Sequence, residues 1–130
     1  HSVMTDILDA FPERDSARVA VNIGAGAGAG VLGKGGSETA DPVFQLFRDF
    51  NFSGLVTEPL TVSEMQEQFP AQVRKISEPT APPNVLRQLR EADIPMDMGL
   101  LKIDIDSYDC EVLDVIMTAG YRPLVVMMEP

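Results

Sequence analysis

Cysteine, histidine and basic side chains are all scarce in this chain, and each shortage narrows the classes of protein to which it can belong. Cys110 is the single cysteine, so no intrachain disulfide can form and a reducing, cytoplasmic location is expected. The lone histidine, His1, precedes Ser2 in what looks like a cloning remnant, and we assign it no catalytic role. Ten basic residues against twenty acidic ones give a net charge of -10, which disfavours nucleic acids and anionic membrane surfaces as partners.

Long apolar runs are also missing. No stretch approaches the roughly 20 residues that a membrane-spanning helix requires, and the start of the chain lacks the pattern of a signal peptide. The 130 residues, 45% of them hydrophobic, are enough for one compact domain. The sequence therefore predicts a single domain without a membrane partner.

Strand-like and helix-like segments alternate along the chain. Apolar and β-branched runs predict five strands, at 18–23, 53–57, 72–76, 99–105 and 124–128. Helical spacing and capping residues predict helices at 3–11, 41–50, 61–69 and 84–92, and a last helix that is capped by residues 106–109 and runs to about residue 119. From residue 18 the order is βαβαβαβαβ, which predicts an α/β fold, a Rossmann-like three-layer sandwich with a mostly parallel sheet and helices on both faces. We expect an N-terminal helix and tag remnant at 1–17 and the domain itself at 18–130.

Alternating glycines follow the first predicted strand and are the most informative feature of the chain. The segment 19–23 has the composition of a buried strand, and Gly24, Gly26 and Gly28 come directly after it. Glycine has no Cβ, so the backbone can turn tightly and approach a ligand closely. Doubly wound folds build a nucleotide or cofactor site from a strand that runs into such a glycine turn. A plain connecting loop is the alternative interpretation.

Two other glycine motifs overlap this region. Residues 28–34 match G-x-x-x-x-G-K, but Gly35 stands where a P-loop needs Ser or Thr to hold magnesium, so nucleoside triphosphate hydrolysis is rejected. Residues 28–33 also satisfy the G-x-G-x-x-G pattern of NAD-binding domains. The next predicted helix starts only at Asp41, whereas a dinucleotide pyrophosphate needs a helix N-terminus directly after the glycines. An NAD-binding Rossmann domain is kept as an alternative.

Several blocks together resemble one enzyme superfamily. Residues 22–28, Asn-Ile-Gly-Ala-Gly-Ala-Gly, resemble the first motif of class I S-adenosylmethionine-dependent methyltransferases, with Asn22 in place of the usual acid. The second predicted strand ends at Glu58, where that superfamily has an acidic residue. Residues 102–106, Lys-Ile-Asp-Ile-Asp, and residues 123–129 resemble the fourth and fifth strands of its FkbM-like branch. The resemblance covers about residues 18–130 and lacks the last two strands of the superfamily's sheet.

This resemblance implies S-adenosylmethionine as cofactor and methyl transfer to an oxygen of a small molecule or sugar. It implies that Asn22 orients the amino or carboxyl group of the cofactor and that Glu58 binds the ribose hydroxyls. Ser77 and Glu78, after the third predicted strand, are implied at the adenine. The expected cofactor-binding residues are Asn22, Gly24, Gly26, Gly28, Glu58, Ser77 and Glu78. The three acidic or hydroxyl residues of the second and third strand ends can also be ordinary surface residues.

Two carboxylates near the fourth predicted strand are the candidates for catalysis. Asp104 and Asp106 lie two residues apart, so on a strand their side chains share one face, and Asp106 falls at the carboxyl end. We expect Asp106 to act as a general base or to bind a cation together with Asp109. Other interpretations stay open. Asp104 can be a core acid paired with Lys102 or a backbone amide, and Asp106 and Asp109 can cap the next helix.

The fifth predicted strand, at 124–128, is apolar throughout and forms an exposed edge if nothing covers it. Such edges pair with other chains, so we expect either a homodimer through this edge or a further segment of a longer polypeptide. A non-catalytic methyltransferase-like scaffold is another alternative, favoured by Asn22 and by the five-strand length. The expected partner of the enzyme interpretation is a small-molecule substrate.

Overall fold

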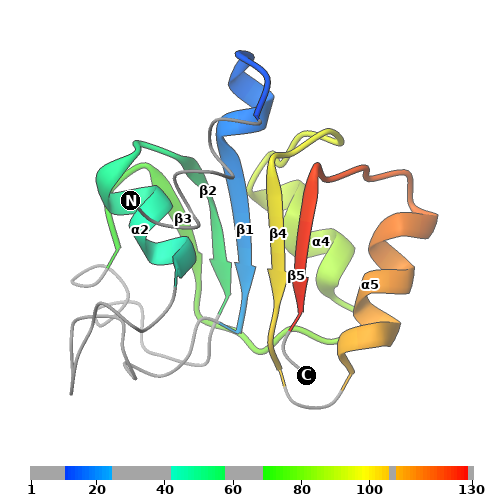
Figure 1. The fold of residues 1–130 in the computed structure, drawn as a ribbon. Helices are drawn as coiled ribbons and strands as arrows, with labels where there is room; N and C mark the ends of the chain where they lie inside the picture. The colour runs from blue at the N-terminus through cyan, green and yellow to red at the C-terminus, as the bar shows by residue number, and fades with distance from the viewer. Residues whose placement is uncertain (1–10, 25–41, 58–68, 106–107, 129–130) are drawn as a thin grey trace.

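The chain folds as a parallel sheet between two layers of helices (Figure 1). The computed structural model describes residues 11–24, 42–57, 69–105 and 108–128. Within them the strands are β1 (Val19–Ile23), β2 (Ser53–Thr57), β3 (Val73–Ile76), β4 (Leu100–Ile103) and β5 (Val125–Met128). The described helices are η1 (Asp15–Arg18, a 3-10 helix), α2 (Pro42–Asp49), α4 (Val85–Glu91) and α5 (Asp109–Thr118). The α/β sandwich predicted from the alternating pattern is confirmed, and every described strand pairing is parallel.

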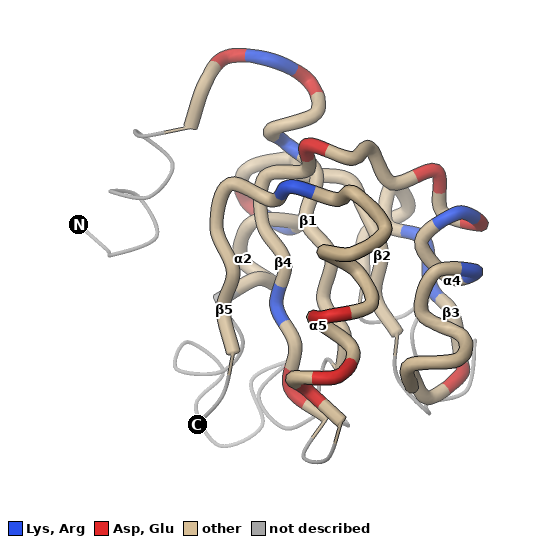
Figure 2. Tube along the Cα trace, turned by 90° about the vertical axis from the view of Figure 1, so that its right-hand side faces the viewer, with Lys and Arg blue, Asp and Glu red and all other residues tan. Residues whose placement is uncertain are grey.

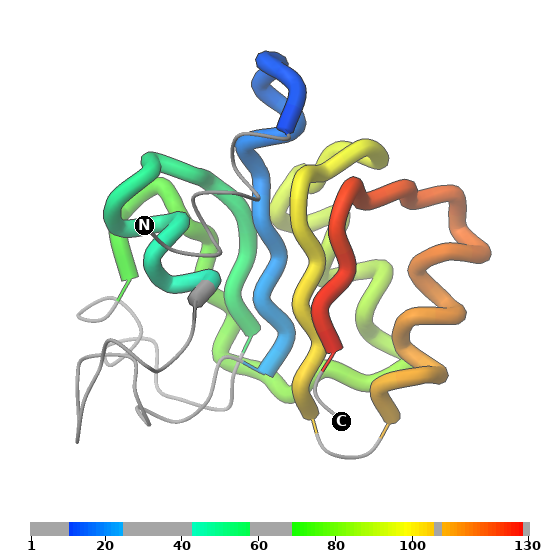
Figure 3. Tube along the Cα trace, in the orientation of Figure 1, coloured from blue at the N-terminus to red at the C-terminus, as the bar shows by residue number. Residues whose placement is uncertain are grey.

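The strand order is β3-β2-β1-β4-β5, so the chain reverses direction across the sheet at β1. From β1 the chain passes through β2 and β3 to one edge of the sheet, and it then returns to place β4 on the other side of β1. Figure 3 shows β1 and β4 side by side although they are far apart in the sequence. In open α/β sheets the loops diverge at such a reversal and leave a crevice outside the carboxyl ends of the strands.

Two apolar cores fill the space between the sheet and its helices. On one face, sheet residues such as Ala20 and Leu100 pack with Phe44 and Phe47 of α2. On the other face, Val21 and Leu101 belong to the cluster that includes residues of α4 and α5. The side chains alternate along each strand, so a central parallel strand is apolar on both faces. This explains why the sequence of the central strands shows continuous apolar runs.

Phe11 and Ala17 connect the segment before β1 to the sheet. Phe11 packs in the α2-side core, its ring 6.1 Å from that of Phe52, and Ala17 is fully buried. The predicted helix at 3–11 and the one at 61–69 lie almost wholly outside the described residues, and the same is true of Asp41, the expected cap of α2. Phe11 itself lies in a bend.

The end of β4 corrects one prediction. We expected a strand over 99–105, but β4 ends at Ile103, opposite Ile23, the last residue of β1. Because β1 also ends there, the strand pairing gives way to a backbone hydrogen bond, 3.0 Å long, from the Asp104 amide to the Ile23 carbonyl. Asp104 therefore lies beyond the strand, and the argument that it shares a strand face with Asp106 is wrong.

The helix that follows begins where the sequence predicts. We expect residues 106–109 to cap a helix that runs to about residue 119, and α5 begins at Asp109, with Tyr108 at the N-cap position and no side-chain capping bond from it. Asp109 Oδ1 accepts a hydrogen bond of 3.1 Å from the Ile105 amide and so joins the end of β4 to the start of α5. The predicted helix end is confirmed, because Gly120 adopts φ +107°, the left-handed backbone that ends helices.

No helix among the described ranges combines the length and the apolar character needed to cross a bilayer.

Candidate functional site

The candidate site lies where β1 and β4 end, at the point where the strand order reverses. Gly24 follows β1 directly and Asp104 follows β4 directly. The Gly24 amide donates to the Thr57 carbonyl at the end of β2, 3.0 Å away, so three adjacent strand ends are joined by backbone hydrogen bonds. The structure therefore places the end of β1, which the sequence analysis assigned to cofactor binding, beside the end of β2 and beside the end of β4, to which it assigned catalysis.

Gly24 is required here by contact of the chain with itself. Its φ is +77°, and a Cβ at this position would lie 2.1 Å from the Asp104 carbonyl oxygen and 2.9 Å from the Ile105 side chain. The sequence analysis explained the glycine by close approach to a ligand. The structure shows that β4's continuation already occupies the space beside its α-carbon, so a ligand can contact only the other sides of this residue.

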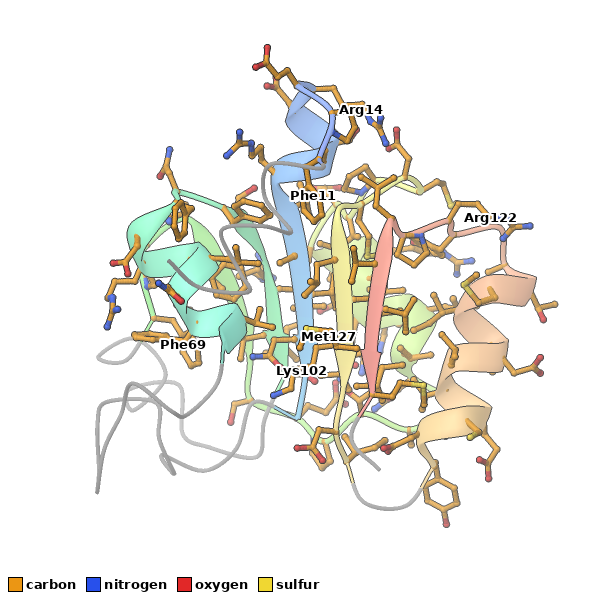
Figure 4. All side chains as sticks on the ribbon, in the orientation of Figure 1. Phe11, Arg14, Phe69, Lys102, Arg122 and Met127 are labelled. Carbon is orange, nitrogen blue, oxygen red and sulfur yellow. The ribbon has the colours of Figure 1, made fainter. Side chains whose placement is uncertain are left out.

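Asn22 and Lys102 are buried polar residues that lie opposite each other on the α2 face of the sheet. Asn22 of β1 is opposite Lys102 of β4, and the residues are 0% and 5% exposed. Both precede the last residue of their strands, so they belong to the final side-chain row on that face. Figure 4 shows Lys102 and Met127 on the face toward the viewer, in the half of the sheet nearer the carboxyl ends. Asn22 thus lies beside the expected site, with a cation as its neighbour.

A chain of buried hydrogen bonds supports the end of β2 on the opposite face. Thr57 Oγ1 lies 2.6 Å from Thr80 Oγ1, and Thr80 Oγ1 donates to Gln88 Oε1 at 2.7 Å. The Thr80 proton is used in the second bond, so Thr57 must donate in the first. All three residues are buried, at 1%, 6% and 0% exposure. The chain fixes the direction of the Thr57 hydroxyl one residue before Glu58.

Glu78 continues this chain to the surface. Its carboxylate accepts from Gln88 Nε2 at 3.2 Å and from Arg87, which also pairs with Glu91. The hydrogen bond from Arg87, followed by that from Gln88, holds the pKa of Glu78 below its usual value. Ser77 and Glu78 follow β3, which lies two strands away from β1, at a distance of about 10 Å. The structure therefore places Glu78 in a network with α4 and apart from Asn22 and Gly24.

The remaining predicted residues divide into two groups. Asp104 is tied to β1 through its amide. Asp109 accepts from the Ile105 amide, which lies before α5, so this bond joins the strand end to the helix and is not the bond to a first-turn amide that the capping interpretation expected. Four residues of the sequence-based assignment lie outside the described residues: Gly26, Gly28, Glu58 and Asp106. Their assigned roles stay predictions.

The sequence analysis missed the Thr57–Thr80–Gln88 chain and the burial of Lys102. The three polar residues are far apart in the sequence, and no spacing pattern brings them together. Lys102 did carry a signal. It interrupts an apolar strand, Leu-Leu-Lys-Ile, at a position where alternation predicts an inward side chain.

A cleft of about 480 Å³ lies at the other end of the sheet. Arg18 precedes β1 and Ser53 begins β2, so the cleft borders the amino ends of the strands. Its lining residues are Asp15, Arg18, Phe50, Asn51, Ser53 and Gln72. A strand of five residues is about 16 Å long, so this cleft is separate from the candidate site.

Within the described ranges, no group of three or more His, Cys, Asp or Glu side chains is arranged to hold a metal ion. Acidic positions do gather where β4 ends and α5 begins, as Figure 2 shows. Asp104, Asp109 and Glu111 contribute to this local negative charge. It attracts cations and disfavours phosphates at this edge.

Comparison with protein-family models, with curated proteins and with solved structures finds no match for this chain. Its fold and site are therefore defined by its own geometry. The chain is an α/β protein with a Rossmann-like parallel sheet, which has five strands in the described residues and reverses its order between β1 and β4.

Proposed function

We propose that this chain binds S-adenosylmethionine over the carboxyl ends of β1 and β4 and transfers its methyl group to an oxygen of a small molecule or sugar. The observation that carries the proposal is the reversal of strand order at β1, directly beside the glycine turn at Gly24. Ligands of doubly wound folds bind at this place. The resemblance of residues 22–28 and 102–106 to methyltransferase motifs supplies the identity of the cofactor.

The local charge supports a sulfonium ligand over a dinucleotide. S-Adenosylmethionine carries a positive sulfur, whereas NAD carries two phosphates. Asp104, Asp109 and Glu111 surround the junction of β4 and α5 and give it a negative field. NAD binding is the second candidate, because the same reversal of strand order serves dinucleotides.

The residues have the following roles in this proposal. Bound S-adenosylmethionine supplies a methyl group activated by the positive sulfur. Glu58 accepts hydrogen bonds from the ribose hydroxyls at its two carboxylate oxygens. Asp106 would take the proton from the acceptor hydroxyl, whose oxygen would bond to the methyl carbon as the bond from that carbon to the sulfur breaks and S-adenosylhomocysteine leaves. The strand ends would position the acceptor for this transfer. Asp104 contributes negative charge beside them.

Calorimetric titration with S-adenosylmethionine, with NAD in parallel, tests the proposal. Binding of S-adenosylmethionine alone supports it, binding of NAD alone supports the dehydrogenase-type alternative, and binding of neither favours a non-catalytic scaffold. Glu58→Ala is expected to weaken S-adenosylmethionine binding by about 1–3 kcal/mol through the loss of ribose contacts.

Glu13→Ala is the matched control, because Glu13 is an exposed acid near the amino ends of the strands. It should leave the affinity unchanged. Equal affinities of Glu58→Ala and the unmodified chain would remove Glu58 from the site.

A further inference from the structure

The cleft at the amino ends of the strands is assembled from four parts of the chain. Asp15 and Arg18 come from η1, Phe50 from the turn after α2, Ser53 from the start of β2, and Gln72 from just before β3. Its volume of about 480 Å³ falls in the range of small-molecule pockets, which is about 300–1,000 Å³. Phe50 is half-buried and packs against the α2-side core. The cleft therefore has the size and the mixed lining of a site for a small polar molecule.

Arg18 is held at this cleft by an aromatic ring and not by an ion pair. Its guanidinium carbon lies 5.8 Å from the centre of the Phe52 ring, within the range of a cation–π contact. Phe52 is fully buried, so the ring is a fixed support. Within the residues that the structure describes, the Arg18 side chain makes no hydrogen bond and no ion pair. Its N–H groups are therefore open to a ligand, and their planar fork matches a carboxylate.

Asp15 places a charge of the opposite sign beside Arg18. The two residues are three positions apart in η1, and a 3-10 helix has three residues per turn, so they lie on the same side of it. They line the same cleft, yet in the described part of the chain no ion pair joins them and the Asp15 carboxylate has no other partner. An unpaired cation and an unpaired anion in one small cleft suit a ligand that carries both charges.

The rest of the lining is neutral and narrows the class of ligand further. Gln72 Nε2 donates to the carbonyls of Phe47 and Phe52, at 3.0 and 3.2 Å, which fixes this amide beside the cleft. Among the described lining residues Arg18 is the one cation, and Asp15 would repel a phosphate, so nucleotides are disfavoured. A neutral ligand would leave both charges without a partner of opposite sign.

We infer that this cleft binds a zwitterionic amino acid, with the ligand's carboxylate on the Arg18 guanidinium and its ammonium group on the Asp15 carboxylate. Both contacts are charge-assisted hydrogen bonds, which are stronger than neutral ones. An apolar side chain on the ligand would contact Phe50. The inference does not depend on the proposed function, because the cleft and the carboxyl edge of the sheet lie at opposite ends of the strands.

The test compares L-leucine with two compounds that each lack one of its charges. Isocaproate retains the carboxylate without the amine, and isoamylamine retains the amine without the carboxylate. The titrations are followed by two-dimensional NMR, in which the side-chain amide signals of Asn51 and Gln72 report on the cleft directly. For the unmodified chain we expect L-leucine to bind about tenfold or more tightly than either compound, because each of these loses one charge-assisted hydrogen bond.

Two substitutions separate the contacts. Arg18→Gln should weaken the binding of L-leucine and of isocaproate about tenfold and should not weaken that of isoamylamine. Asp15→Asn should weaken the binding of L-leucine and of isoamylamine and should not weaken that of isocaproate. Arg74→Gln is the matched control for the loss of a positive charge, because Arg74 is exposed on β3 and does not line the cleft. It should change none of the three affinities.

Thermal unfolding of each variant establishes that it is folded. The Asp15 side chain has no partner to lose within the described residues, so Asp15→Asn provides the test if Arg18→Gln does not fold. The inference would be overturned if the unmodified chain bound L-leucine no more tightly than the two single-charge compounds. Equal losses for all three compounds in a variant, or Asn51 and Gln72 signals that do not shift, would overturn it as well. Each of these outcomes leaves the proposed function standing, since that is tested separately with S-adenosylmethionine.

Discussion

Gly24 shows how one residue carries two constraints. Its φ of +77° favours glycine, and so does the Asp104 carbonyl oxygen, 2.1 Å from the place of a Cβ. Both constraints come from the path of the chain at the reversal of strand order. The glycine thus holds the ends of β1 and β4 together and gives the candidate site its shape.

Gly24→Ala is expected to lower the free energy of unfolding by about 1–3 kcal/mol, because the backbone must leave its left-handed conformation or the end of β4 must move. Chemical denaturation followed by circular dichroism measures this change.

Gly120→Ala is the control that measures the cost of the left-handed backbone without the close contact. Gly120 has φ +107°, but nothing lies within 4 Å of the place of its Cβ. It should lose less stability than Gly24→Ala, since only the backbone preference is affected. A Gly24 variant no less stable than the Gly120 variant would contradict the close contact with Asp104.

At the scale of elements, α4 is joined to the strand ends by polar groups as well as by its apolar face. Gln88 links it to Thr80, and Arg87 links it to Glu78, so the loop after β3 is held from two positions of the helix. Polar networks of this kind fix one geometry, because each buried group needs its partner. The order of the loop at the carboxyl edge therefore depends on α4.

Glu78 makes part of this order depend on pH. Its pKa in the folded chain lies below the ordinary value of 4.5, chiefly because of Arg87. Well above pH 4.5 the Glu78 carboxylate is charged in both the folded and the unfolded chain, and its full contribution to the free energy of unfolding is present. As the pH falls below 4.5, the unfolded chain takes up the proton first, so stability is lost until the folded carboxylate is protonated too.

The Glu78→Gln variant should therefore lose less of its free energy of unfolding on acidification than the unmodified chain does. Near neutral pH the free energy of unfolding should depend on pH in the same way in both proteins. Denaturant unfolding at a series of pH values on both sides of 4.5 measures this. Asp49, whose pKa is lowered by Arg48, remains in the variant and retains its own share of the acid dependence. Profiles with the same slope for both proteins would show that the Glu78–Arg87 pair adds no stability.

At the scale of the whole molecule, β5 is an edge of the described sheet. Its partner is β4 on one side, and Val126 and the preceding Leu124 are 39% and 43% exposed. Unpaired backbone groups and apolar side chains on an edge strand favour pairing with another chain. The exposed apolar residues of β5 therefore support the expectation that the chain self-associates through this edge.

We expect light scattering to give twice the chain mass of 14.1 kDa, and Val126→Lys to return the mass to that of one chain, since lysine on an edge strand opposes pairing. Met96→Lys is the control, because Met96 is 52% exposed but lies outside the strands. A monomeric unmodified chain would remove β5 as a dimer interface.

The sequence by itself determined the elements and their order. β-Branched runs produced β1, β2 and β5 within one residue of the predicted bounds, and Gly120 ended α5 as expected. These features depend on local preferences and on side-chain alternation, which neighbouring residues decide. The parallel sheet follows from them, because short strands alternating with helices leave few other arrangements.

Only the tertiary structure decided what meets at the strand ends. β4 stops at Ile103 because β1 stops opposite it, and Thr57, Thr80 and Gln88 meet although they are far apart in the chain. Lys102 is buried beside Asn22 because the register of β1 and β4 aligns them. Register and strand order depend on packing across the whole sheet, and no local sequence pattern encodes which residues meet across it.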